Sequence, residues 1–109
     1  MQKGDKLYLI TRKDISAGYQ AVQSAHALMQ FNVEHPEISR LWFDKSNYLC
    51  LLSVENEKEL YSLICRAKDE GLKLSIFREE DIDNQITAIA LEPNERSKML
   101  CSNLKLALR

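Results

Sequence analysis

The 109-residue chain contains few residues that interrupt regular structure, with only three glycines and two prolines. This composition excludes collagen-like and low-complexity chains. Uninterrupted apolar runs are short, so we expect no membrane-spanning segment. The first residues contain no apolar stretch of signal-peptide length, so we expect no export signal. The length predicts a single domain over residues 1–109, and the lack of an export signal predicts a cytoplasmic location.

The sequence also lacks closely spaced cysteine pairs and a large net charge. The three cysteines, Cys50, Cys65 and Cys101, cannot all pair within one chain, and no two are spaced as C-x-x-C. We therefore expect small buried residues in a reducing compartment, with no zinc site. The net charge is −1, so any binding of nucleic acid needs a local cluster of basic side chains.

The apolar pattern alternates between the periods of strands and helices. It predicts four strands and three helices, with a short additional helical piece at 36–42; the strands are at 7–10, 48–52, 72–77 and 86–91, and the helices at 16–34, 56–70 and 93–108. Ser16 and Asn56 are expected N-caps, and Pro93 is the expected first residue of the last helix. The predicted element order is βαβαββα.

The connections predict the strand directions. The first two connections contain helices, so the first three strands should be parallel. Only residues 78–85 join the third strand to the fourth, which is too short for a parallel crossover. We therefore expect a three-layer α/β/α fold with a four-stranded mixed sheet whose last strand is antiparallel. This topology brings residues 12–19, 78 onward and 84–85 to one sheet edge, where ligands of such sheets bind.

The helix at 16–34 has two distinguishable sides. Its apolar positions, expected to form one packed face, are Ala21, Val22, Ala25, Leu28, Met29 and Val33. Beside them is a polar stripe of Tyr19, Gln23, His26 and Gln30. The stripe is either a solvated face or a functional one, and its first turns lie near the predicted site. Interface candidates are the aromatic residues Phe31, Trp42 and Phe43.

The segment after the third strand, Arg78-Glu79-Glu80-Asp81-Ile82-Asp83-Asn84, contains four carboxylates. Clustered carboxylates serve as general bases or bind Mg²⁺ or Ca²⁺, and they also occur in loops that simply face water. The spacing matches no calcium-loop pattern. The sequence contains no phosphate-binding glycine loop, nucleophile elbow or zinc spacing. We expect no cofactor, and the metal hypothesis for this loop stays open.

The segment from Arg12 to Ala27 resembles the type II peptidyl-tRNA hydrolase family, which reads approximately Arg-x-Asp-Leu…Gly-Lys-x-x-x-Gln-x-x-His-Ala. Arg12, Asp14, Gly18, Gln23 and the His26-Ala27 pair are in register with that pattern. The likeness extends over residues 6–108. It implies the same fold and cleavage of the ester between a nascent peptide and tRNA.

The resemblance also implies the site residues. The implied catalytic residues are Tyr19 in place of the family lysine, Gln23, Glu79 or alternatively Asp81 for the loop aspartate, and Asn84 in place of a threonine. The implied substrate-binding residues are Arg12, Lys13, His26, Arg78 and Gln85. The loop after the third strand is shorter than the family's.

Two functions are therefore expected from the sequence. The first is a divergent, weakly active peptidyl-tRNA hydrolase with tRNA as its partner. The second is a family member that has lost the reaction and binds a small acyl ligand, a protein or tRNA. The resemblance also suggests a homodimer.

Overall fold

The structure of the chain, a computed structural model, describes residues 1–108. Its elements are β1 (Lys6–Arg12), α1 (Ala17–Glu34), α2 (Pro36–Lys45), β2 (Tyr48–Val54), α3 (Glu57–Asp69), β3 (Leu74–Glu79), a 3₁₀ turn η1 (Glu80–Ile82), β4 (Gln85–Leu91), α4 (Glu95–Leu100) and β5 (Lys105–Leu106). The strands form one sheet in the order β3-β4-β1-β2-β5. The predicted βαβαββα order is confirmed, with β5 as an addition.

The strand directions follow the lengths of the connections. β1 and β2 are parallel over their whole length, from Lys6 opposite Tyr48 to Arg12 opposite Val54. β4 is antiparallel to both β1 and β3, so β3 has the same direction as β1. The predicted antiparallel return of β4 is therefore confirmed.

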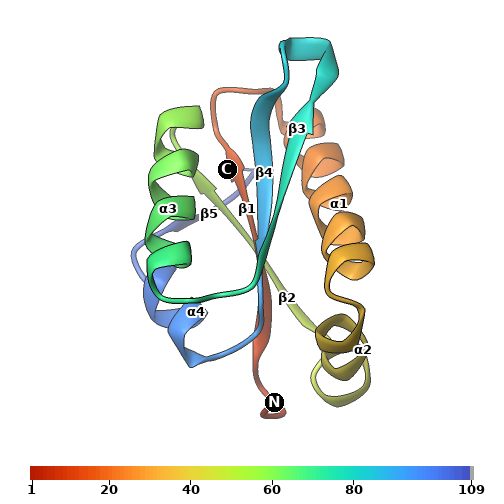
Figure 1. Cartoon of the computed structure of the whole chain (residues 1–109). Coiled ribbons are helices and arrows are strands. Elements are labelled where there is room, and N and C mark those ends of the chain that lie inside the picture. Colours follow the sequence, from red (N-terminus) through yellow and green to blue (C-terminus); the bar gives the residue numbers. More distant parts are fainter. Residues whose placement is uncertain (109) are drawn as a thin grey trace.

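Helices cover both faces of the sheet (Figure 1). α1 and α2 lie on one face, and α3 and α4 lie on the other. Each face has its own apolar core. The α1 side is built around Leu7, Leu9 and Phe31, whereas the α3 side contains Ile10, Leu60 and Ile89. Residues of β1 alternate between these cores, which is why the strand reads as a nearly continuous apolar run.

Local capping defines where the helices begin. The side chain of Ser16 accepts the N–H of Tyr19, and that of Asn56 accepts the N–H of Glu59, as expected for N-caps. The last helix differs from its prediction. Its N-cap is Asn94, whose side chain accepts the N–H of Ser97, so Pro93 lies before the helix rather than at its first position.

The expected helix over 93–108 is wrong in its second half. α4 ends at Leu100, and the chain then turns and adds β5 antiparallel to β2, with Leu106 opposite Leu52. The sheet consequently has five strands instead of four. A two-residue strand at a sheet edge leaves almost no periodic signal, so the apolar pattern alone extended the expected helix through residues 101–108.

The packed side of α1 is the reverse of the one predicted. Its buried residues are Gln20, Gln23, Ser24, Ala27 and Phe31. Val22 and Met29, predicted to pack, are 53% and 62% exposed. Of the predicted polar stripe, Gln23 is buried against the sheet, Tyr19 and Gln30 are half-buried, and His26 is exposed.

Two smaller expectations also need correction. Cys65 is exposed, whereas Cys101 is buried and Cys50 is partly buried. Phe31 and Trp42 are buried, so Phe43 alone of the three interface candidates is exposed. Across residues 1–108, no helix combines the length and the apolar character needed to cross a bilayer.

The orientation of α1 makes a stability prediction. Phe31 is fully buried and Val33, two residues along, is 70% exposed. Phe31→Ala should lower the free energy of unfolding by about 3–5 kcal/mol because it empties a core position. Val33→Ala, the matched control, should change it by less than about 0.5 kcal/mol when both variants are unfolded at a dilution that keeps the chain monomeric. Urea unfolding of both variants measures this, and comparable losses would contradict the assigned orientation.

Candidate active site

The predicted convergence at one sheet edge is present. The loop from β1 to α1, the end of β3 and the start of β4 meet there, as the upper end of Figure 1 shows. This is the edge formed by the carboxyl ends of β1, β2 and β3. The first turns of α1 bring their side chains to the same place.

Gln23 forms the centre of this site. Its side chain is 1% exposed and lies between α1 and the sheet. Its Nε2 donates to Oε1 of Glu79 at 2.9 Å, and its Oε1 accepts from Oγ1 of Thr87 at 2.5 Å. Hydrogen bonds therefore connect β4, α1 and β3 through a single amide. Both of these hydrogen bonds are made within the protein.

Thr87 reaches Gln23 because β4 contains a bulge. Phe77 lies opposite Ala88, but the next residue, Arg78, lies opposite Ile86, so Thr87 is an extra residue in β4. Ile86 belongs to the core under α3 and Ala88 to the core under α1. A bulge allows consecutive side chains to point to one face. This arrangement directs Thr87 as well as Ala88 toward α1.

Glu79 is held as a carboxylate. Hydrogen bonding from Gln23 lowers the pKa of Glu79, and the backbone N–H of Asp81 and the Tyr19 hydroxyl act in the same direction. The Asp81 N–H lies 3.3 Å from Oε2 of Glu79. Glu79 rather than Asp81 is the carboxylate bonded to Gln23, and Asp81 contributes only its backbone to this contact.

Tyr19 and His26 flank the central pair on α1. Desolvation, followed by the negative charge of Glu79, raises the pKa of Tyr19, so its hydroxyl stays a proton donor. His26 stacks on Phe77, with ring centroids 4.6 Å apart and planes 5° from parallel. Tyr19, Gln23 and His26 thus follow one side of α1 along β3, as the predicted stripe requires.

The remaining predicted residues lie apart from Gln23. Arg12 is 8% exposed, and its guanidinium bonds Asp14, Gln85 and the carbonyl of Ile86. Its pairing with Asp14, at 2.8 Å, lowers the pKa of that carboxyl. Arg12 and Gln85 therefore join the β1–α1 loop to β4, and their contacts are within the protein.

Exposed polar residues surround the site on the hairpin tip and the neighbouring loop. Lys13 pairs with Glu55 at 3.8 Å. Arg78 donates to the carbonyl of Asn84, and Asn84 has a left-handed backbone with φ 59°. The tip thus presents Asn84 to solvent. Across residues 1–108, no three acidic, histidine or cysteine side chains are grouped as metal ligands.

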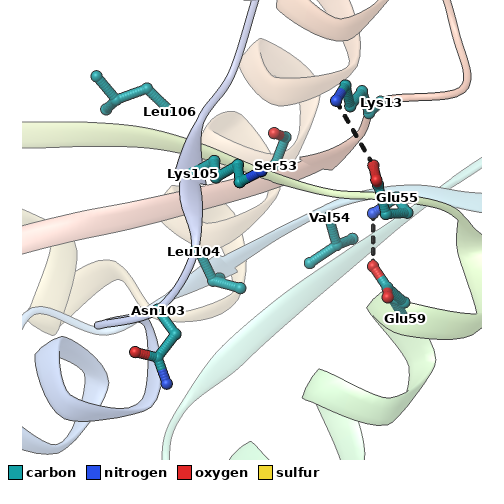
Figure 2. Close-up of a pocket in the computed structure, with 9 residues that line it drawn as sticks. All are labelled: Lys13, Ser53, Val54, Glu55, Glu59, Asn103, Leu104, Lys105 and Leu106. Atoms are coloured by element: carbon teal, nitrogen blue, oxygen red, sulfur yellow. Dashed lines mark hydrogen bonds and ion pairs between the residues drawn. The ribbon is translucent and has the colours of Figure 1, made fainter.

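A hollow lies at the same edge of the sheet. It is a cavity of about 530 Å³ where β5 lies beside the end of β2. Figure 2 shows Lys13 directed toward Glu55, whose backbone N–H is bonded by Glu59. Neither Gln23 nor Glu79 lines this cavity, so it is separate from the site described above.

Comparison with known proteins identifies the family. The family model described as peptidyl-tRNA hydrolase PTH2 matches residues 5–107. The chain belongs to the PTH2 family. A protein named peptidyl-tRNA hydrolase from Thermococcus sibiricus is 31% identical over 113 residues, covering 93% of this chain and 96% of that one. Its counterpart from Thermococcus onnurineus is also 31% identical, over 81% of this chain and 83% of the relative.

Structural comparison shows the same fold in a distant protein. A solved structure of a protein of unknown function from Agrobacterium tumefaciens matches with a TM-score of 0.69 and 14% identity. It covers 97% of this chain and 98% of its own. At 31% identity to the two Thermococcus relatives, this chain is a divergent member of the PTH2 family.

Two residues that contact the candidate site were missed by sequence reasoning. Thr87 was read as part of a buried strand, and Phe77 as the end of another. A signal for Thr87 was present, since it is the one hydroxyl in the apolar run Ile86–Leu91, and a buried hydroxyl requires a partner. Phe77 carries no comparable signal, because its role depends on the orientation of His26.

The link between Gln23 and Glu79 predicts a pKa change. Gln23→Leu removes the hydrogen bond that contributes most to the lowered pKa of Glu79, so the pKa of Glu79 should rise toward the ordinary value. A carboxyl whose pKa is lowered by folding contributes stability above its unfolded pKa, lost as pH falls through its folded pKa. The free energy of unfolding of Gln23→Leu should therefore fall less steeply than that of the wild type as the pH decreases through this acidic range.

Carbon-13 NMR titration of the Glu79 carboxyl measures the pKa change directly. Gln30→Leu is the matched control, because Gln30 is on the same helix and bonds Glu34 instead. An unchanged pKa of Glu79 in Gln23→Leu would refute the described contact.

Proposed function

We propose that this chain hydrolyses the ester between a peptide, or an N-blocked amino acid, and tRNA. The observation that carries the proposal is the 2.9 Å bond between Gln23 and the ionised Glu79. These residues occupy positions that the family resemblance implies are catalytic, and membership of the PTH2 family supports the same reaction class.

The proposed chemistry follows from the donors and acceptors present. Glu79 accepts a proton from a water that attacks the ester carbonyl. The Tyr19 hydroxyl, which is bonded to Glu79 in the resting site, turns to donate to the oxyanion once Glu79 has accepted the proton. The proton then passes from Glu79 to the departing 3′ oxygen of the ribose. The products are a free carboxylic acid and tRNA with a free hydroxyl.

Two features predict a slow enzyme. The lowered pKa of Glu79 makes it a weak base that orients water better than it deprotonates it. Tyr19 supplies a neutral donor where the family pattern has a positive charge. Thr87 acts as a positioning residue, because its bond to Oε1 of Gln23 turns the amide nitrogen toward Glu79.

Phosphate contacts are proposed for Lys13 and Arg78, two exposed cations of this edge. Glu80, Asp81 and Asp83 on the hairpin oppose them electrostatically. We therefore propose weak tRNA binding with a shallow dependence on salt. A cytoplasmic location is proposed because that substrate arises during translation.

Hydrolysis of an N-acetyl-aminoacyl-tRNA tests this function. Glu79→Gln should lower kcat by about 10²-fold or more, and Gln23→Ala should do so by a similar factor. Glu80→Gln, one residue further along the hairpin, is the matched control and should leave kcat unchanged. Tyr19→Lys should increase kcat by placing a positive charge beside the oxyanion. Absence of turnover by both wild type and Tyr19→Lys would refute the hydrolase assignment.

A second function is a binding module without turnover. It is favoured by the acidic hairpin beside Glu79 and by the missing positive charge at Tyr19. Titration with uncharged tRNA distinguishes the two candidates. A salt slope near zero, together with absent hydrolysis, supports the binding module for an acyl ligand or a protein.

We further propose that two copies associate through α1. Residues 15–33 contain no Asp, Glu, Lys or Arg, although one side of the helix is exposed. Val22, Met29 and Val33 form an exposed apolar stripe on it, and a groove of about 360 Å³ separates Met29 from Phe43 of α2. An uncharged apolar helix face is unusual against water and typical of an interface core. A two-fold axis would pair this stripe with itself.

Sedimentation measures this association. The wild type should sediment as a dimer, and Met29→Glu as a monomer, because a buried charge without a partner disrupts the apolar contact. Tyr61→Glu is the matched control: Tyr61 is 59% exposed, close to the 62% of Met29, but lies on α3 across the sheet. Monomeric wild type would contradict the proposal.

A further inference from the structure

β3 is the outermost strand of the sheet on the side of the candidate site. Figure 1 shows the molecule from this edge, with helices on either side and β3 and β4 in front. Within residues 1–108, β4 is the only strand that pairs with β3. The outer edge of β3 is therefore not paired with a strand, and it runs toward Glu79, the last residue of β3.

Backbone contacts show which groups of β3 point outward. The carbonyl of Lys73 accepts the N–H of Glu92 and so points toward β4. The carbonyl of the next residue, Leu74, is bonded by Nε2 of His35 at 3.0 Å and points away from β4. Because these directions alternate along an antiparallel strand, Ile76 presents both its N–H and its carbonyl at the outer edge.

We infer that this edge of β3 binds the peptide moiety of the substrate as an added β-strand. The inference rests on the proposed function, since the reacting ester must lie beside Glu79. The carboxyl end of the peptide is attached through that ester, so the peptide runs from the His35 end toward Glu79, parallel to β3. Ile76 receives one hydrogen bond from the peptide backbone and donates one to it.

Main-chain pairing suits a substrate whose side chains vary. Every peptide offers the same N–H and carbonyl pattern, so pairing with Ile76 requires no particular sequence. His35 sets the limit of the docking edge, because it already occupies the outward carbonyl of Leu74. From Leu74 to Glu79 an extended chain spans roughly 17 Å, or about five residues. Peptide residues beyond that length add no contact to this edge.

The test uses non-hydrolysable mimics, N-acetyl-oligoalanine joined by an amide to 3′-amino-3′-deoxyadenosine. A mimic with about three alanines should bind the wild type roughly tenfold more tightly than one with a single alanine, as two net backbone hydrogen bonds allow. About seven alanines should bring no further gain. Ile76→Pro, which removes the outward N–H, should abolish the gain and leave binding of the single-alanine mimic unchanged. Ile76→Val, the matched control, should retain it.

N-methylated mimics test the pairing without altering the protein. Methylation of the amide that faces Ile76 should abolish the gain, whereas methylation of the adjacent amide, which faces solvent, should preserve it. Equal affinity at all lengths, or indifference to methylation, overturns the inference. Length-independent hydrolysis of peptidyl-tRNA also overturns it while sustaining the proposed function. A length-dependent gain without any hydrolysis sustains the docking edge and overturns the proposed function.

Discussion

The buried amide of Gln23 is the constraint on which the site depends. An amide in the interior must have its polar atoms paired, because an unsatisfied group costs about 1–3 kcal/mol. Thr87 and Glu79 satisfy the two ends of Gln23 from different strands. The requirement fixes the rotation of α1, the height of the helix over the sheet and the position of the carboxylate. Packing and site geometry are consequently one arrangement.

Sequence reasoning succeeded where the signal is local. Buried strands such as β1 and the N-caps Ser16 and Asn56 are encoded in short stretches. Connection lengths then determined strand directions and the edge at which Arg12, Tyr19 and Arg78 meet. Gln23 was assigned from the resemblance, and the structure places it against the expected carboxylate. Whether these residues act on a substrate stays a prediction.

Sequence reasoning failed where tertiary contacts override periodicity. The more apolar side of α1, with Val22 and Met29, was expected to pack against the sheet, but Gln23 and Ser24 occupy that side instead. Hydrophobic periodicity identifies the apolar side of a helix, but it does not say whether the sheet or another surface covers that side. The bulge at Thr87 likewise depends on how β3 and β4 align, and no single-strand pattern contains that information.

The β3–β4 hairpin separates its paired strands, which hold the site, from the tip that joins them. Glu79 and Thr87 lie on two strands held together by the β3–β4 pairing, with the 3₁₀ turn and the left-handed residues Asp83 and Asn84 between them. Residues added to or deleted from that tip leave the two strands, and hence the two side chains, in place. The length of the tip can therefore change without moving the bonds of Gln23, although the contact of the Asp81 N–H with Glu79 changes with it.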